Sequence, residues 1–199
     1  MANIPLYNAS IPHFKTGLTV LSQILTKAAL HFHDAPDEIL KATLIEGMLP
    51  LPGHVLLVSN IAKKSLTRMA GIQVDVWPDD EEDTVEKLIA RCERTIELLD
   101  TVAPRDVDGH EGDKVEFRLG GYELKMTAEE CLMKYAVPVF GFHLGLVYAM
   151  LRMKGVELGF ADFLMPGVGP FWLRRLLVTA DREDDREVRL RGLSTSQKR

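Results

Sequence analysis

The chain has 199 residues, of which 46% are hydrophobic and 27% charged, and its formal net charge is −5. This length and composition suit one globular domain with room for a short extension. The acidic balance offers no domain-wide basic surface to replace phosphate counterions, so we expect no nucleic-acid partner. No uninterrupted apolar run reaches the length of a membrane span, and the N-terminus lacks the pattern of a signal peptide. We therefore expect a cytoplasmic protein without a membrane partner.

The cysteine content points the same way. The sequence contains two cysteines, Cys92 and Cys131, which are too few for the disulfide framework of a small secreted domain. Both fall within apolar helical patterns, so we predict two buried thiols in an intracellular protein.

Hydrophobic periodicity predicts four long helices. The first starts near Pro12, with Ser10 as its cap, and carries one stripe of apolar residues at helical spacing. The second covers about residues 54–70 and ends at Gly71, a natural terminator. The segment between them is rich in proline and is predicted to be mainly a connection.

The third helix is predicted over about residues 84–101, directly after the acidic run "DDEED" at residues 79–83. Acidic side chains at the start of a helix suit the helix dipole, so we interpret the run as part of a helix cap. A cation site is the alternative interpretation of the same residues.

A change of period from two to 3.6 residues marks the last part of the predicted domain. Residues 115–126 alternate between apolar and polar around Gly120-Gly121, which predicts a β-hairpin. Thr127 and Glu130 then have the spacing of a capping box and start the fourth helix.

The fourth helix is predicted to run to about Lys154 and to stop at Gly155. Pro138 lies inside it and cannot donate a backbone hydrogen bond, so we expect a kink there. The helix is apolar nearly all round from Tyr135 to Met150, and we therefore expect it to be the most buried of the four. Four amphipathic helices hide their stripes only against one another, which predicts a mainly all-α four-helix bundle with a small β-hairpin.

Three stretches resemble the DUF1993 family, a family of uncharacterised proteins. They are "YNASIPHFKTGLTVLSQILTKA", "MLPLPGHVLLVSNIAKKSLTRMAG" and "LGGYELKMTAEECLMKYAVPVFGFHLGLVYAMLRMKGVELGFADFL". The resemblance covers roughly residues 4–164. It implies a bundle at residues 1–164 related to the DinB/YfiT-like proteins, followed by an extension at residues 165–199. Within the extension we predict a short docked helix at residues 171–179 and a mobile charged tail.

The resemblance also raises the question of a metal, because many DinB/YfiT-like bundles bind a divalent ion through three histidines on different helices. His54 and His143 lie on the second and fourth predicted helices. The positions four residues from His143 hold Val139 and Val147, which cannot coordinate a metal. We therefore predict no metal ligand set and no cofactor, with a degenerate site of His54, His143 and a carboxylate as the alternative.

His143 remains the main candidate for chemistry. In an apolar pocket it would stay neutral and could act as a general base, with Tyr135 as a second catalytic residue nearly on the same helix face. We add Tyr7, His54 and Phe142 as candidate binding residues. The structural alternative is a core histidine that bonds a tyrosine hydroxyl or a backbone carbonyl freed near Pro138.

Three functions follow from these residues. The first is a protein that binds a small apolar molecule, which extends to a metal-independent enzyme using a buried histidine. The second is a non-catalytic dimerisation or interaction module, and in either case we expect a homodimer. The third is a divalent-metal-dependent hydrolase or transferase of the DinB type with a degenerate site. A cavity that touches His143 would favour the first, and a broad exposed apolar face would favour the second.

Overall fold

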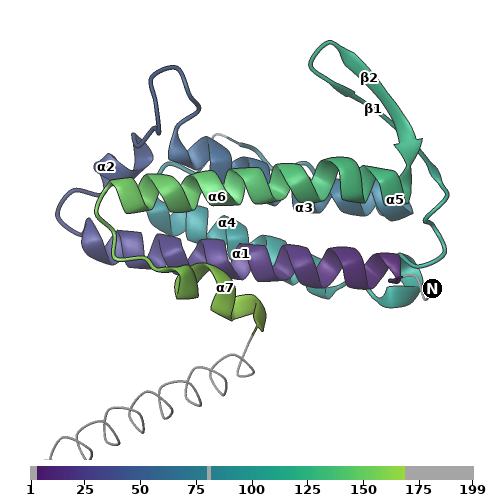
Figure 1. Cartoon of the computed structure of the whole chain (residues 1–199), viewed down its shortest axis with the longest axis horizontal. Coiled ribbons are helices and arrows are strands. Elements are labelled where there is room, and N and C mark those ends of the chain that lie inside the picture. Colours follow the sequence, from purple (N-terminus) through teal and green to yellow (C-terminus); the bar gives the residue numbers. More distant parts are fainter. Residues whose placement is uncertain (1–3, 80–81, 169–199) are drawn as a thin grey trace, which may run out of the picture.

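The computed structural model describes residues 4–79 and 82–168. Four long helices run side by side in it: α1 (Leu6–His31), α3 (Leu51–Ala70), α4 (Val85–Asp100) and α6 (Val137–Met153) (Figure 1). Among the long helices, α1 packs mainly against α4 and α6, and α3 packs against the same two helices. α1 and α3 therefore occupy one diagonal of a four-helix bundle, and their buried faces form one continuous core with those of α4 and α6.

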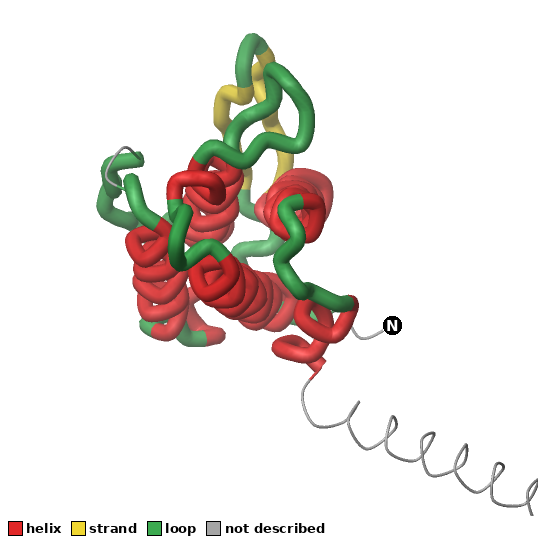
Figure 2. Tube along the Cα trace, turned by 90° about the vertical axis from the view of Figure 1, so that its left-hand side faces the viewer, coloured by secondary structure: helices red, strands yellow, loops and turns green. Residues whose placement is uncertain are grey.

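Shorter elements join and extend the bundle. They are α2 (Asp37–Leu40), the 3₁₀ turn η1 (Pro104–Asp106), strands β1 (Lys114–Leu119) and β2 (Tyr122–Thr127), α5 (Ala128–Cys131), the π-helical turn η2 (Leu132–Ala136) and α7 (Phe160–Val168). The hairpin projects from the end of the bundle where α5 begins (Figure 1). The end-on view in Figure 2 shows that it stands to one side of the helices and is not inserted between them.

The first helix begins earlier than its sequence predicts. α1 starts at Leu6, so Pro12 lies inside the helix, and Ser10 donates its hydroxyl to the Leu6 carbonyl at 2.7 Å and does not cap the helix. Leu6 and Ile11 are both buried. The burial of these two side chains outweighs the single backbone hydrogen bond that Pro12 removes, because Pro12 lies on the exposed side of the helix.

The predicted ends of the second and third helices are confirmed. α3 ends at Gly71, which adopts the left-handed conformation with φ of 66°. α4 is capped by Thr84, whose hydroxyl accepts a hydrogen bond from the Lys87 backbone nitrogen at 3.3 Å. Both cysteines are buried and free, as predicted, and burial raises the pKa of the Cys92 thiol to about 12.

The interpretation of the acidic run as a helix cap is wrong for Asp79 and Glu82. Both carboxylates bind the buried guanidinium of Arg91 on α4, at 3.0 and 2.6 Å. The cation that Asp79 and Glu82 bind is therefore the Arg91 side chain. Arg91 is 4% exposed, and a charge this deeply buried requires a partner.

The hairpin and the capping box that follows it are confirmed. Val115 pairs with Met126 in an antiparallel register, and Gly120 turns the chain with φ of 57°. Thr127 and Glu130 make both hydrogen bonds of a capping box. The break expected at Pro138 is a π-helical turn, η2, directly before the proline, which widens the helix where an ordinary backbone bond is missing.

The expectation that the last long helix is the most buried is wrong. One face of α6 packs on α1 and α3, but the opposite face leaves Phe142 57% exposed and Met153 52% exposed. The hairpin turns away from this face, so nothing in the described part of the chain covers it. The helical stretch Ala128–Met153 is long and apolar enough to cross a membrane, which is weak evidence because core helices of globular proteins meet the same criterion.

α7 extends the bundle along α1. Lys27 and Asp162 form an ion pair at 2.6 Å, and the rings of Tyr148 and Phe163 meet edge to face at 5.6 Å. The predicted boundary at residue 164 falls inside this helix. The helix predicted at residues 171–179 and the predicted mobile tail lie outside the described residues.

Gly17 is the point of closest approach between α1 and α6. A Cβ atom at Gly17 would lie 2.2 Å from the ring of the buried Phe140. We expect Gly17→Ala to lower the free energy of unfolding by about 1–3 kcal/mol through overpacking. Gly112→Ala adds the same methyl group on a loop, in open space and without a left-handed backbone conformation, so it should change the free energy of unfolding by less than about 0.5 kcal/mol. Urea denaturation of both variants measures the difference, and equal effects would contradict the close approach.

Candidate functional site

Two histidines from different helices meet in the bundle. His54 lies on the first turn of α3 and is 2% exposed, and His143 lies in the middle of α6 and is half-buried. Their Nδ1 atoms are 2.8 Å apart, which is a hydrogen-bond distance. The ring centroids are 5.0 Å apart with an angle of 38° between the planes. The pair joins α3 to α6 across 89 positions of sequence.

The prediction of the partner of His143 is therefore wrong. Among the described residues, its ring bonds His54 Nδ1 and neither a tyrosine hydroxyl nor a carbonyl near Pro138. His54 was predicted separately as a binding residue. The family resemblance had brought His54 and His143 together only as the alternative metal site with a carboxylate. Their direct hydrogen bond depends on the relative rotation of two packed helices, which hydrophobic periodicity does not determine.

The two rings share one proton between their Nδ1 atoms, and the tautomer decides which ring donates it. The Leu49 backbone carbonyl acts on His54 and opposes the fall in its pKa. His54 Nε2 is buried and has no hydrogen-bond partner among the described residues. With Nε2 protonated, His54 Nδ1 accepts and His143 Nδ1 donates. The Nε2 atom of His143 then carries a free lone pair.

Both imidazoles are held in the neutral form. Burial lowers the pKa of His54 below its usual value. Burial also lowers the pKa of His143, and the neighbouring His54 lowers it further because two imidazolium ions at this distance repel each other. A neutral His143 with a free Nε2 lone pair can accept a proton or a hydrogen bond at neutral pH.

The other predicted site residues lie at different distances from this pair. Phe142 is adjacent to His143, with its ring edge-to-face against the imidazole at 5.1 Å. Tyr135 instead packs against Phe117 of the hairpin, with ring centroids 4.9 Å apart. Tyr7 lies at the start of α1, where its backbone nitrogen donates to Asp108. Of the three, only Phe142 has a ring contact with His143.

The donor set does not fit the three-histidine metal site of the DinB/YfiT-like proteins. Only two histidine nitrogens converge, and no group of three His, Cys, Asp or Glu side chains in residues 4–79 and 82–168 is close enough to hold a metal. Two nitrogens bound to one tetrahedral zinc ion lie about 3.3 Å apart, which is longer than the 2.8 Å between the two Nδ1 atoms. The distance suits a shared proton instead.

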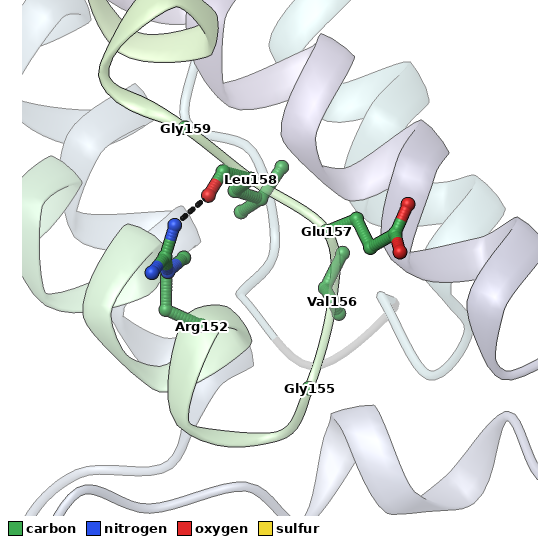
Figure 3. A pocket seen from close by; sticks show the side chains of 6 residues that line it. All are labelled: Arg152, Gly155, Val156, Glu157, Leu158 and Gly159. Atoms are coloured by element: carbon green, nitrogen blue, oxygen red, sulfur yellow. Dashed lines mark hydrogen bonds between the residues drawn. The ribbon is translucent and has the colours of Figure 1, made fainter.

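One hollow in the described part of the chain lies away from the histidine pair. It has a volume of about 520 Å³ and is formed by Arg152 together with residues 155–159 of the loop that leaves α6 (Figure 3). It is open and shallow. Arg152 donates to the Leu158 carbonyl across it, while Glu157 points away from the guanidinium. Because its polar groups stabilise the loop itself, we do not assign a ligand to it.

The fold and the site define a DinB-like helical bundle with a paired-histidine centre. The chain belongs to the DUF1993 family, described as a domain of unknown function, whose model matches residues 6–164. A solved structure of a DinB family member protein from Shewanella denitrificans is similar, with a TM-score of 0.71 and 24% sequence identity. The match covers 80% of this chain and 92% of that chain, and it supports the fold alone. No curated protein matches the sequence.

The lowered pKa values predict a pH-dependent stability. Unfolding returns both histidines to a pKa of about 6.5, so below that pH the unfolded chain binds protons that the folded chain resists. Stability should be complete above pH 6.5 and should fall as the pH decreases from there. We expect the melting temperature to decrease between pH 7.5 and pH 5.5, and the decrease to be smaller in the double variant His54→Gln/His143→Gln.

His13 is the matched control, because burial lowers its pKa as well, although its ring contacts Phe14 and Phe140 and not the pair. His13→Gln should leave most of the pH dependence in place. An equal loss in the control and in the double variant would contradict the assignment to the pair.

Proposed function

We propose that this protein binds a small, largely apolar molecule that carries one weakly acidic group, and that His143 Nε2 accepts the proton or hydrogen bond of that group. The Nδ1–Nδ1 hydrogen bond at 2.8 Å carries the proposal. It orients His143 through the buried His54 and leaves the opposite ring nitrogen free for a ligand. Phe142, at ring-contact distance from His143, would supply an apolar wall.

The same arrangement extends to catalysis without a metal. A thiol or phenol that gives its proton to His143 Nε2 becomes a thiolate or phenolate, which is the nucleophilic form. The developing imidazolium would be stabilised through Nδ1–H by the lone pair of His54 Nδ1. In this mechanism His143 is the base and His54 is the positioning residue. Two buried, unpaired thiols support a reducing, cytoplasmic environment.

Nitrogen-15 NMR of the full chain tests the proton assignment. We expect a protonated Nδ1 and an unprotonated Nε2 on His143 at pH 7.5. Titration with phenol and with 2-mercaptoethanol as probes should shift His143 Nε2 selectively. His143→Gln should abolish the response, while His13→Gln should retain it. A protonated Nε2 on His143, or equal responses of both variants to the probes, would contradict the proposal.

Stability separates a binding role from a purely structural one. His143→Ala leaves the buried His54 ring without its partner and should lower the free energy of unfolding by about 1–3 kcal/mol. Glutamine can still donate to His54, so His143→Gln should retain most of the stability while losing probe binding. Stoichiometric zinc, iron or nickel in tag-free protein, lost in His143→Ala, would instead support a degenerate DinB-type metal enzyme.

Homodimerisation is a second candidate function, supported by the exposed side of α6. We define the α6 outer stripe as the exposed or half-exposed residues that recur at helical spacing: Pro138, Gly141, Phe142, Gly145, Ala149 and Met153. An added Cβ at Gly141 or Gly145 would meet no atom within 4 Å. In the stripe, the Phe142 ring lies beside two glycines that have no side chain. A second copy of the stripe could place its Phe142 ring against these glycines, so the surface is complementary to itself.

Charge insertion into the α6 outer stripe tests the dimer. We expect light scattering to give a dimer mass for the wild-type chain and a monomer mass for Gly145→Arg. Thr26→Arg places the same side chain on an exposed position of α1 and should leave the mass unchanged. A monomer mass for the wild-type chain at about 100 μM would contradict this candidate, because that concentration is well above the dissociation constants of specific dimers.

A further inference from the structure

A second cluster of polar groups lies on the other side of α3, around Lys63. This lysine is 5% exposed, and its Nζ lies 3.5 Å from the centroid of the Trp77 ring. Trp77 belongs to the loop between α3 and α4 and is itself buried. Within the described residues, the Lys63 ammonium has this ring contact but no hydrogen bond or ion pair. A buried ammonium group without an acceptor is costly.

The neighbouring Arg91 has a full set of hydrogen-bond acceptors, unlike Lys63. All five N–H donors of the Arg91 guanidinium are used. Their acceptors are Ser59, Asn60, the Pro78 carbonyl, Asp79 and Glu82. Arg91 therefore accounts for the described carboxylates nearest to it, and its role in fixing the loop explains its burial. Lys63 contributes a charge to the same cluster without an equivalent set of partners.

Lys63 lines a cavity of about 200 Å³ between α3 and this loop. The polar lining includes two lysines, Lys63 and Lys64, and two aspartates, Asp75 and Asp79. Thr67, Val74, Val76 and the Trp77 ring complete much of the wall. The positive and negative charges of the lining balance, so the cavity favours a neutral polar molecule over an anion.

The charge environment keeps part of the Lys63 amine unprotonated. Burial lowers the pKa of Lys63 to about 8, and the nearby Arg91, Arg94 and Lys64 contribute to the decrease, while Asp79 opposes it. At pH 7 an amine with this pKa is about 10% neutral, whereas an ordinary lysine is less than about 0.1% neutral. The neutral form is the nucleophile.

We propose that Lys63 is a nucleophilic lysine that forms an imine with a small neutral aldehyde or ketone bound in this cavity. The amine lone pair bonds to the carbonyl carbon, and the carbonyl oxygen takes up a proton to give a carbinolamine. Loss of the nitrogen proton and of water then leaves the C=N bond, so that amine and carbonyl compound give imine and one water. Asp75 lines the cavity and is the carboxylate available as a general base, because Asp79 binds Arg91.

Reductive alkylation of the full chain tests this site. The probe is propanal with sodium cyanoborohydride, which reduces an imine to a stable secondary amine, and peptide mass spectrometry then measures the rate at each lysine. We expect Lys63 to be labelled at least about tenfold faster than Lys64 at pH 7, because its neutral fraction is larger. The advantage should shrink towards pH 10, where ordinary lysines also lose their protons.

Two variants and one competitor complete the design. Lys63→Met removes an unpaired buried charge, so the variant should fold, and it should lose the fast-reacting position. Lys64→Met is the matched control and should retain it. Labelling of Lys63 no faster than that of Lys64 in folded protein would overturn the proposal. Protection of Lys63 by millimolar inorganic phosphate would also overturn it, because the occupant would then be an anion.

Discussion

The structure depends on one constraint: α3 buries polar side chains together with its apolar stripe. Six polar residues of this helix are buried or half-buried, and a polar group away from water needs a partner. Ser65 donates to the Ile61 carbonyl of its own helix, and Asn60 bonds Asp79 and Arg91. His54 pairs with His143, Ser59 with Thr95 and Arg91, Lys63 with Trp77, and Arg68 with the rings of Phe117 and Tyr135. These partners belong to α6, α4, the α3–α4 loop, the hairpin and η2, so α3 fixes the positions of all of them.

Helical geometry separates the two candidate sites that result. His54 and Lys63 are nine residues apart in the sequence, which is two and a half turns and about 14 Å along the axis. They therefore point to opposite sides of α3. His54 faces α6, where a second imidazole shares its proton, and Lys63 faces the loop and α4, where Arg91 uses the nearby acceptors. The same helix thus supports a neutral histidine pair at one end and an amine without a hydrogen-bond acceptor further along.

The remaining exposed feature follows from the way the connections are routed. α1 and α3 lie on one diagonal, and both pack on α6, while the hairpin that precedes α5 projects away from the helices. Within residues 4–79 and 82–168, this leaves the α6 outer stripe uncovered, with Gly141 and Gly145 at its centre. α6 is apolar on nearly all sides, although only one of its faces belongs to the core. Its composition alone does not distinguish a core face from an exposed one.

Local rules were sufficient for the features that depend on a few neighbouring residues: the Gly71 terminator, the hairpin turn and the capping box of Thr127 and Glu130. The family resemblance and the four apolar stripes were sufficient for the bundle. Only the tertiary structure paired His54 with His143, assigned Asp79 and Glu82 to Arg91, extended α1 back to Leu6 and exposed one side of α6. Each of these depends on the rotation and neighbours of a packed helix, whereas periodicity in a sequence defines a helix face but does not define what that face meets.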